Sequence, residues 1–132
     1  MRERPLVLLV DDEDDFLEIL KIKLEAAGFE VAIAHNGAEG VAAAKKLMPD
    51  IVLMDINMPG ETGTDAALTI KQDPATHDIK IAFLTSLRDP WPTLKSGNEE
   101  ITKEIGIEAF FEKTDDLDLI AKRVKMLLQP AS

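Results

Sequence analysis

Three aspartates stand directly after runs of apolar residues. Asp11 and Asp12 follow the run 6–10, and Asp55 follows the run 51–54. Both runs contain only valine, leucine, isoleucine and methionine, which is typical of strands buried on both faces. A carboxylate at the end of such a strand is costly to ionise unless a cation compensates it. Asp55 alone could simply cap a loop, but three converging carboxylates favour a hard divalent cation such as Mg²⁺.

A hydroxyl and an ammonium group follow two later apolar runs. Thr85 follows the run 79–84, and Lys113 lies just after the run 107–111. The carboxyl ends of parallel strands lie at one edge of a sheet, so both side chains are expected near the aspartates. Their chemistry suits an anionic oxygen. Together with a cation on the carboxylates, they indicate a site for a phosphoryl group carried on an aspartate.

The two aspartates after the first run open a stretch of five consecutive acids, Asp11 to Asp15. Acids are favoured in the first turn of a helix, and this explains Glu13, Asp14 and Asp15. It does not explain Asp11 and Asp12, which fall where the strand ends and the loop begins.

Hydrophobic periodicity divides the chain into five strands that alternate with five helices. An α/β fold follows, with a parallel sheet, right-handed crossovers and helices on both faces. Strands are expected over 6–10, 29–34, 51–55, 79–84 and 107–111, and helices over 16–27, 38–47, 64–71 and 98–105, with a last one that runs to 128 from a cap at Thr114 or Asp115.

Composition narrows the function classes. The chain has 132 residues, 45% of them hydrophobic, which predicts one folded domain over residues 1–132. The formal charge of −10 argues against nucleic acid or a membrane surface as a direct partner. The absence of cysteine excludes disulfides and thiolate metal sites. Without a signal peptide or a span-length apolar run, a cytoplasmic protein is expected.

In these motifs the chain resembles a CheY-like response-regulator receiver domain of two-component signalling. The resemblance covers essentially the whole chain, and it implies a flavodoxin-like (βα)5 fold with strand order 2-1-3-4-5. It is carried by Val10-Asp11-Asp12, by the stretch from Leu53 through Asp55 and Pro59 to Gly60, by Gly63, by Leu84-Thr85-Ser86 and by Lys113.

The resemblance also implies roles for individual residues. Asp55 would accept a phosphoryl group from a sensor histidine kinase or a histidine phosphotransfer protein. Asp12 and Asp55 would bind Mg²⁺ directly, Asp11 through water, and Asn57 through its main-chain carbonyl. Lys113 and Thr85 would contact the phosphoryl oxygens.

A conformational switch is implied as well. Thr85 and Phe110 would change position together, and the face formed by the fourth helix and fifth strand would then control an output partner that the sequence does not name. The chain departs from its relatives in two ways. Phe110 stands where tyrosine is commoner, and Thr114 follows Lys113 where the family usually has proline, often after a cis bond.

Two other functions remain as alternatives. A metal-dependent phosphohydrolase would also place acids at strand ends, although Asn57 is not a second acid there and no cap domain is expected. A receiver-shaped interaction module that never takes phosphate would not need the full set of site residues. The expected protein is therefore a signalling switch rather than an enzyme, and it catalyses only its own phosphorylation and dephosphorylation.

Overall fold

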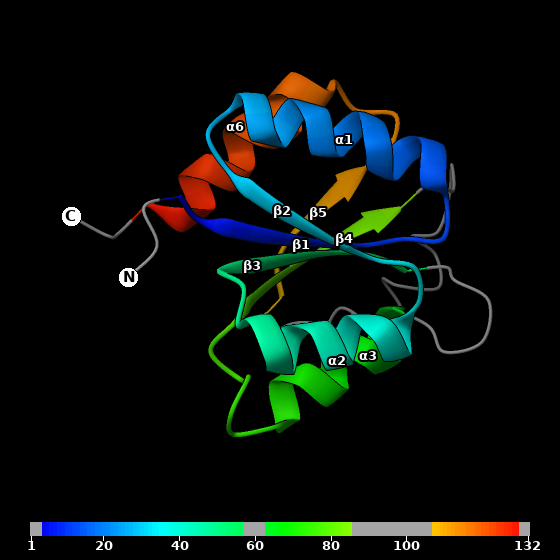
Figure 1. Cartoon of the computed structure of the whole chain (residues 1–132), viewed down its shortest axis with the longest axis vertical. Coiled ribbons are helices and arrows are strands. Elements are labelled where there is room, and N and C mark those ends of the chain that lie inside the picture. Colours follow the sequence, from blue (N-terminus) through cyan, green and yellow to red (C-terminus); the bar gives the residue numbers. More distant parts are fainter. Residues whose placement is uncertain (1–3, 57–62, 86–106, 130–132) are drawn as a thin grey trace.

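A five-stranded parallel sheet forms the centre of the molecule (Figure 1). The computed structural model describes residues 4–56, 63–85 and 107–129. The strands lie in the order β2-β1-β3-β4-β5, as predicted. Their bounds are β1 Leu6–Val10, β2 Glu30–Ala34, β3 Ile51–Asp55, β4 Lys80–Thr85 and β5 Ile107–Glu112.

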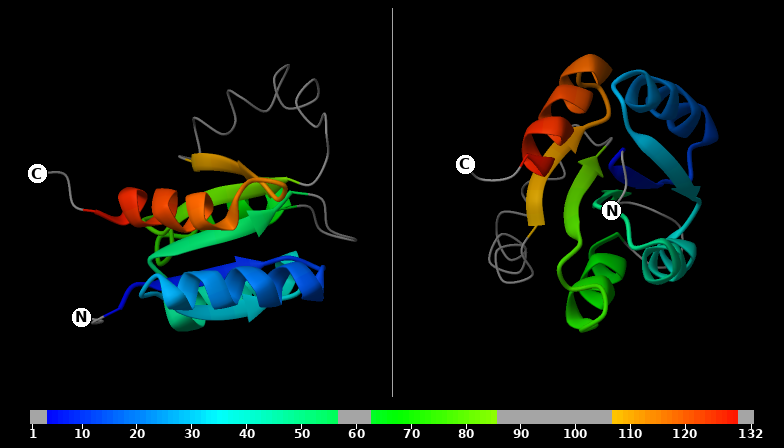
Figure 2. Two further views of the ribbon diagram at one scale, coloured as in Figure 1. Left: turned by 90° about the horizontal axis from the view of Figure 1, so that it is seen from above. Right: turned by 60° about the vertical axis from the view of Figure 1, so that its left-hand side comes forward.

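Helices cover both faces of this sheet. In the described residues, α1 and α6 lie over one face and α2 and α3 over the other, an arrangement seen from a second side in Figure 2. The helices are α1 Asp14–Ala26, α2 Gly37–Leu47, α3 Gly63–Gln72 and α6 Leu117–Leu128. The helix expected over 98–105 lies outside the described residues.

The core consists of two apolar layers that the sheet separates. Leu17, Leu20 and Leu24 of α1 are buried at helical spacing, and they pack with Val7 and Leu9 of β1. The alternate β1 residues belong to the opposite layer, because successive side chains of a strand point to opposite faces. Burying one such leucine contributes about 1.5–3 kcal/mol, so these layers supply most of the stabilisation that holds the sheet edges in place.

Local signals set the ends of the helices. Gly28 follows α1 with φ of +103°, a conformation that glycine adopts without strain. Asn36 is the N-cap of α2, and its side-chain oxygen accepts a hydrogen bond from the Glu39 N–H at 2.9 Å.

The predicted cap of the last helix was wrong. Asp116 is the N-cap of α6, and its carboxylate accepts from the Asp118 N–H at 2.9 Å. The Asp115 carboxylate instead accepts from the Glu112 N–H at 3.1 Å, in the turn that precedes the helix. Thr114 and Asp115 had been predicted as alternatives because both have capping side chains, and the turn at 112–115 moves the cap to the next residue.

One irregularity occurs in β5. Ile81 pairs with Ile107, but the next residue, Ala82, pairs with Ala109, so Glu108 is an extra residue in the strand. The bulge shifts the alternation of side chains between the two faces by one residue. After it, Phe110 packs on the α2 and α3 layer and Phe111 on the α1 and α6 layer.

Charged groups at the amino end of the sheet are bonded to backbone. The Asp50 carboxylate accepts from the Leu6 N–H at 2.7 Å, and the Asp50 N–H donates to the Leu6 carbonyl at 2.9 Å. The Lys80 ammonium donates to the Leu127 carbonyl at 2.5 Å, which ties β4 to the end of α6. These contacts fix where β1, β3 and β4 begin.

Candidate functional site

The carboxyl edge of the sheet gathers the polar residues that follow the strands. Asp11 follows β1, Asp55 ends β3, Thr85 ends β4 and Lys113 follows β5. Backbone hydrogen bonds extend the ladder to this point, including Lys113 N–H to the Thr85 carbonyl at 2.8 Å. The strand order reverses between β1 and β3, which is where ligands bind in doubly wound sheets.

Three carboxylates at this edge form a candidate cation site. Asp11, Asp12 and Asp55 each place an oxygen within 4.8 Å of the others. Asp11 and Asp55 are buried, whereas Asp12 is exposed and opens the group to water. Hard oxygen donors with one side open to solvent fit Mg²⁺, which takes one or two carboxylates and keeps several waters.

Lys113 reaches into the same group. Its Nζ lies 2.6 Å from Asp11 Oδ2, 2.7 Å from Glu13 Oε1 and 3.3 Å from Asp55 Oδ2, and only 6% of its side chain is exposed. The ring of Phe16 adds a cation–π contact at 5.0 Å from its centroid. The ammonium is therefore fixed closest to Asp11 and Glu13.

The charge balance of this cluster is negative, and the pKa shifts reflect it. Burial raises the pKa of Asp11 above 3.8, and the contact with Lys113 offsets only part of that rise. Burial alone would lower the pKa of Lys113, but hydrogen bonds to Asp11 and Glu13 and the charge of Asp55 together raise it above 10.5. The rise at Asp11 comes from its burial, whereas the rise at Lys113 comes from the several carboxylates around one ammonium. The resulting surplus of carboxylates favours a bound cation.

The predicted switch pair lies on one face of the sheet. Thr85 is buried at the end of β4, and Phe110 packs beside Phe83 with 5.6 Å between ring centroids. Phe83 pairs with Phe110 in the ladder, so Thr85, two residues further along β4, points to the same side. Thr85 and Phe110 therefore lie on the same face of the sheet, on neighbouring strands.

Gly63 explains one further motif residue. An added Cβ at this position would lie 2.1 Å from the Asp55 carbonyl oxygen. The Gly63 N–H donates to the Ile56 carbonyl at 3.0 Å, so the start of α3 packs directly on the end of β3. Only glycine permits this approach without displacing Asp55.

Several sequence-predicted residues fall outside the described ranges. Asn57 and Ser86 are among them, so the expected carbonyl ligand has no structural description. No cis peptide bond occurs in the described residues, and Lys113 therefore enters the site through a trans bond to Thr114.

Sequence reasoning missed two contacts of Lys113. Glu13 had been interpreted as an acid of the first helical turn, and Phe16 as part of the apolar face of α1. The structure places Glu13 at the N-cap, with no side-chain capping bond, and turns its carboxylate to Lys113. The available signal was a glutamate at the N-cap, where serine, threonine, aspartate or asparagine is preferred.

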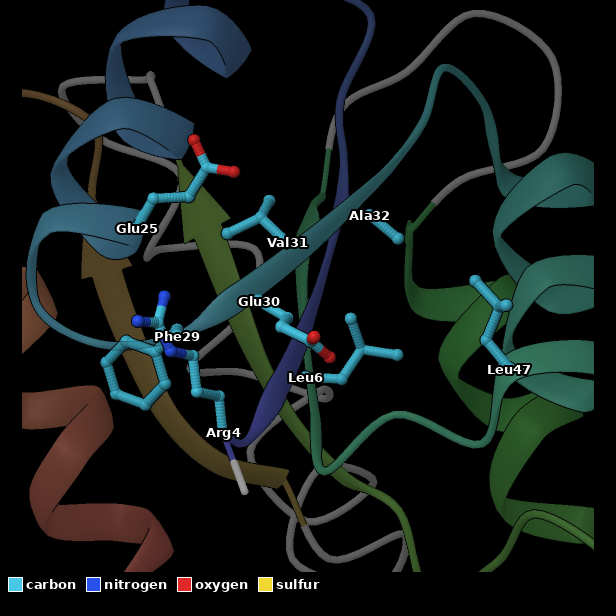
Figure 3. A pocket seen from close by; sticks show the side chains of 8 residues that line it. All are labelled: Arg4, Leu6, Glu25, Phe29, Glu30, Val31, Ala32 and Leu47. Carbon is cyan, nitrogen blue, oxygen red and sulfur yellow. The ribbon is translucent and has the colours of Figure 1, made fainter. Parts of the chain in front are cut away.

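An open groove lies away from these residues (Figure 3). It has a volume of about 720 Å³ and follows the outer strand β2 between the ends of α1 and α2. None of the lining residues is a polar strand-end residue of the acidic edge. They are Arg4, Leu6, Glu25, Phe29, Glu30, Val31, Ala32 and Leu47.

Fold and site together define a doubly wound α/β protein with an acidic edge that suits a cation and an anion. The chain belongs to the response regulator receiver domain family, whose model matches residues 7–125. Domains of this family are signalling switches. None of the helices described in residues 4–56, 63–85 and 107–129 has the length and apolar character needed to cross a membrane.

Known relatives and solved structures agree with this membership. The chain is 30% identical to the DNA-binding dual master transcriptional regulator RpaA of Synechocystis sp. over 95% of its length, which covers 56% of that protein. It is 32% identical to the response regulator PleD of Caulobacter vibrioides over 92% of its length and 25% of that protein. The chain thus spans about half, or less, of these curated relatives.

The structural neighbours are closer to this chain in size. A putative response regulator from Chloroflexus aurantiacus superposes with a TM-score of 0.82 at 29% identity, covering 96% of this chain and 98% of that one. The chemotaxis protein CheY4 of Vibrio cholerae gives 0.80 at 25% identity, with 93% and 98% covered.

Proposed function

We propose that this domain accepts a phosphoryl group on Asp55 from a phosphohistidine of a sensor histidine kinase or histidine phosphotransfer protein. The observation that carries this proposal is the place of Asp55. It is a buried carboxylate at the strand-order reversal, with two further aspartates and the Lys113 ammonium beside it. Family membership supports the same chemistry.

The transfer is a displacement at phosphorus. An oxygen of Asp55 forms the new P–O bond while the P–N bond to the donor histidine breaks, and the electron pair of that bond returns to the imidazole. Asp11, Asp12, Asp55 and the Asn57 carbonyl would hold Mg²⁺, which would neutralise charge on the phosphoryl oxygens. Lys113 and Thr85 bind the remaining oxygens through their ammonium and hydroxyl groups.

The phosphorylated state acts on a partner through the switch pair. Thr85 moves toward a phosphoryl oxygen, Phe110 takes up the space, and the surface around β5 changes. Direct binding of nucleic acid by this segment is not expected at a net charge of −10. Relatives whose names describe them as DNA-binding are longer than this chain. We place the protein in the cytoplasm, where its kinase donors would meet it, as a single domain over residues 1–132.

Intact-mass measurement after incubation with acetyl phosphate and Mg²⁺ tests the acceptor. The native protein should gain one acid-labile phosphoryl group, and Asp55→Asn should gain none. Asp50→Asn is the matched control, because it changes an aspartate at the other end of the same strand. Undiminished labelling of Asp55→Asn would place the acceptor elsewhere, and continuous release of phosphate from an ester would indicate a phosphohydrolase.

A further inference from the structure

The three carboxylates around Lys113 differ in how freely they can leave it. Asp11 and Asp55 have side chains that are 0% and 2% exposed, whereas the Glu13 side chain is 57% exposed. Asp11 is also held by the Glu13 N–H, which donates to its Oδ1 at 3.0 Å. Glu13 is therefore the one carboxylate of the three that can turn into water at little cost.

The Glu13 side chain binds Lys113 and does not cap the helix. Glu13 is the N-cap of α1, with extended backbone angles and no capping bond from its side chain. A residue that leaves helix N–H groups without a side-chain cap gives up stabilisation that serine or aspartate would provide. Its carboxylate instead lies 2.7 Å from Nζ.

Glu13 also stands apart from the candidate cation site. Asp11 and Asp55 belong to the three aspartates that suit a metal ion, and Glu13 does not. When a cation binds to those aspartates, Glu13 is not one of its ligands and still contacts Lys113. An ammonium has three N–H donors, and Nζ of Lys113 lies within 3.3 Å of an oxygen of each of the three carboxylates.

We propose that Glu13 is a positioning residue that holds Lys113 near Asp11 and competes with the incoming phosphoryl group for its third N–H. This inference depends on the proposed phosphorylation of Asp55 and deepens it. Lys113 exchanges Glu13 for a phosphoryl oxygen when the acceptor is loaded, and Glu13 turns toward solvent. Because the contact with Glu13 has to be lost, the site binds the phosphoryl group more weakly than it would without Glu13. Glu13 thereby sets how readily the domain becomes phosphorylated.

Beryllofluoride, which imitates a phosphoryl group on aspartate, provides the test. Its dissociation constant is measured by fluorine NMR at saturating Mg²⁺. Glu13→Gln removes the competing charge and should tighten binding about two- to five-fold, the range expected for a half-exposed ion pair. Asp15→Asn is the matched control, because Asp15 is an exposed acid in the first turn of α1 and is not one of the carboxylates around Nζ.

A second comparison shows whether Glu13 acts through the lysine. In a Lys113→Met background, Glu13→Gln should leave beryllofluoride binding unchanged. Tightening that persists there, equal tightening in Asp15→Asn, or weaker binding by Glu13→Gln would each overturn the competition. Native binding that Glu13→Gln leaves unchanged overturns this inference alone. No binding by the native protein would overturn the proposed function, and this inference with it.

Discussion

The two ends of the sheet use the same charged residue types in opposite ways. Asp50 lies just before β3 and Asp55 ends it, and Lys80 begins β4 while Lys113 follows β5. At the amino end, the carboxylate and the ammonium each bond a backbone group at 2.7 and 2.5 Å. At the carboxyl end, Lys113 instead faces three carboxylates. A charged group that bonds to backbone stabilises the fold, whereas a cluster with a surplus of negative charge favours the binding of a cation.

The largest difference between the ends should appear in Lys113→Met. Removing the ammonium leaves Asp11 and Asp55 buried without it, which should cost about 3 kcal/mol at neutral pH without divalent cation. Because folding raises the pKa of Lys113 above 10.5, its contribution is present below that pH and is lost as the pH rises through the folded-state value. Urea unfolding of both proteins across this range measures it, and a difference that grows above pH 10.5 would contradict the assignment.

Asp50→Ala should lower the free energy of unfolding by about 2 kcal/mol, since it leaves a part-buried Leu6 N–H without its carboxylate partner. Phosphoryl acceptance should not change, because the effect is confined to the amino end. Urea unfolding and intact-mass labelling of the same sample measure both quantities. A variant of native stability, or one that no longer takes phosphate, would remove the distinction between the two ends.

Asp11→Asn should stabilise the protein, whereas the two preceding substitutions destabilise it. Because burial raises the pKa of Asp11, its ionised form costs stability above the folded-state pKa, and this cost disappears as the pH falls toward 3.8. The variant should therefore melt roughly 3–6 °C higher at neutral pH without Mg²⁺ and gain little in acid. The stabilisation by Mg²⁺ should be smaller than in the native protein, and thermal melts with and without the ion test this.

Lys80→Met should give the smallest effect, about 0.5–1 kcal/mol, because it removes a hydrogen bond to the Leu127 carbonyl near the surface. The matched comparison is Lys113→Met, which makes the same substitution at the other end of the sheet. Equal losses for the two lysines in urea unfolding would show that the acidic edge carries no special charge imbalance.

Much of the fold could be predicted because parallel strands are buried on both faces. The runs 6–10 and 51–54 had no other simple interpretation, and Asp11 and Asp55 followed from where these runs end. The caps and the partners of Lys113 could not be predicted in the same way. Asp115 and Asp116 have equal capping chemistry, and the contact between Glu13 and Lys113 joins residues 100 positions apart. Such choices depend on backbone geometry that local patterns do not contain.

The extra residue in β5 has a consequence for how this chain tolerates changes of length. Without Glu108, Ile107 and Ala109 would be adjacent and would still face Ile81 and Ala82, so the ladder would become regular. When a later residue of β5 is deleted and the ladder becomes regular, the residues between Ile107 and the deleted position instead move one place along the strand, which turns the Glu108 side chain into the core. Glu108 is therefore the residue of this strand whose deletion displaces no core side chain, and a deletion scan across 108–112 should give the most stable folded protein when Glu108 is removed.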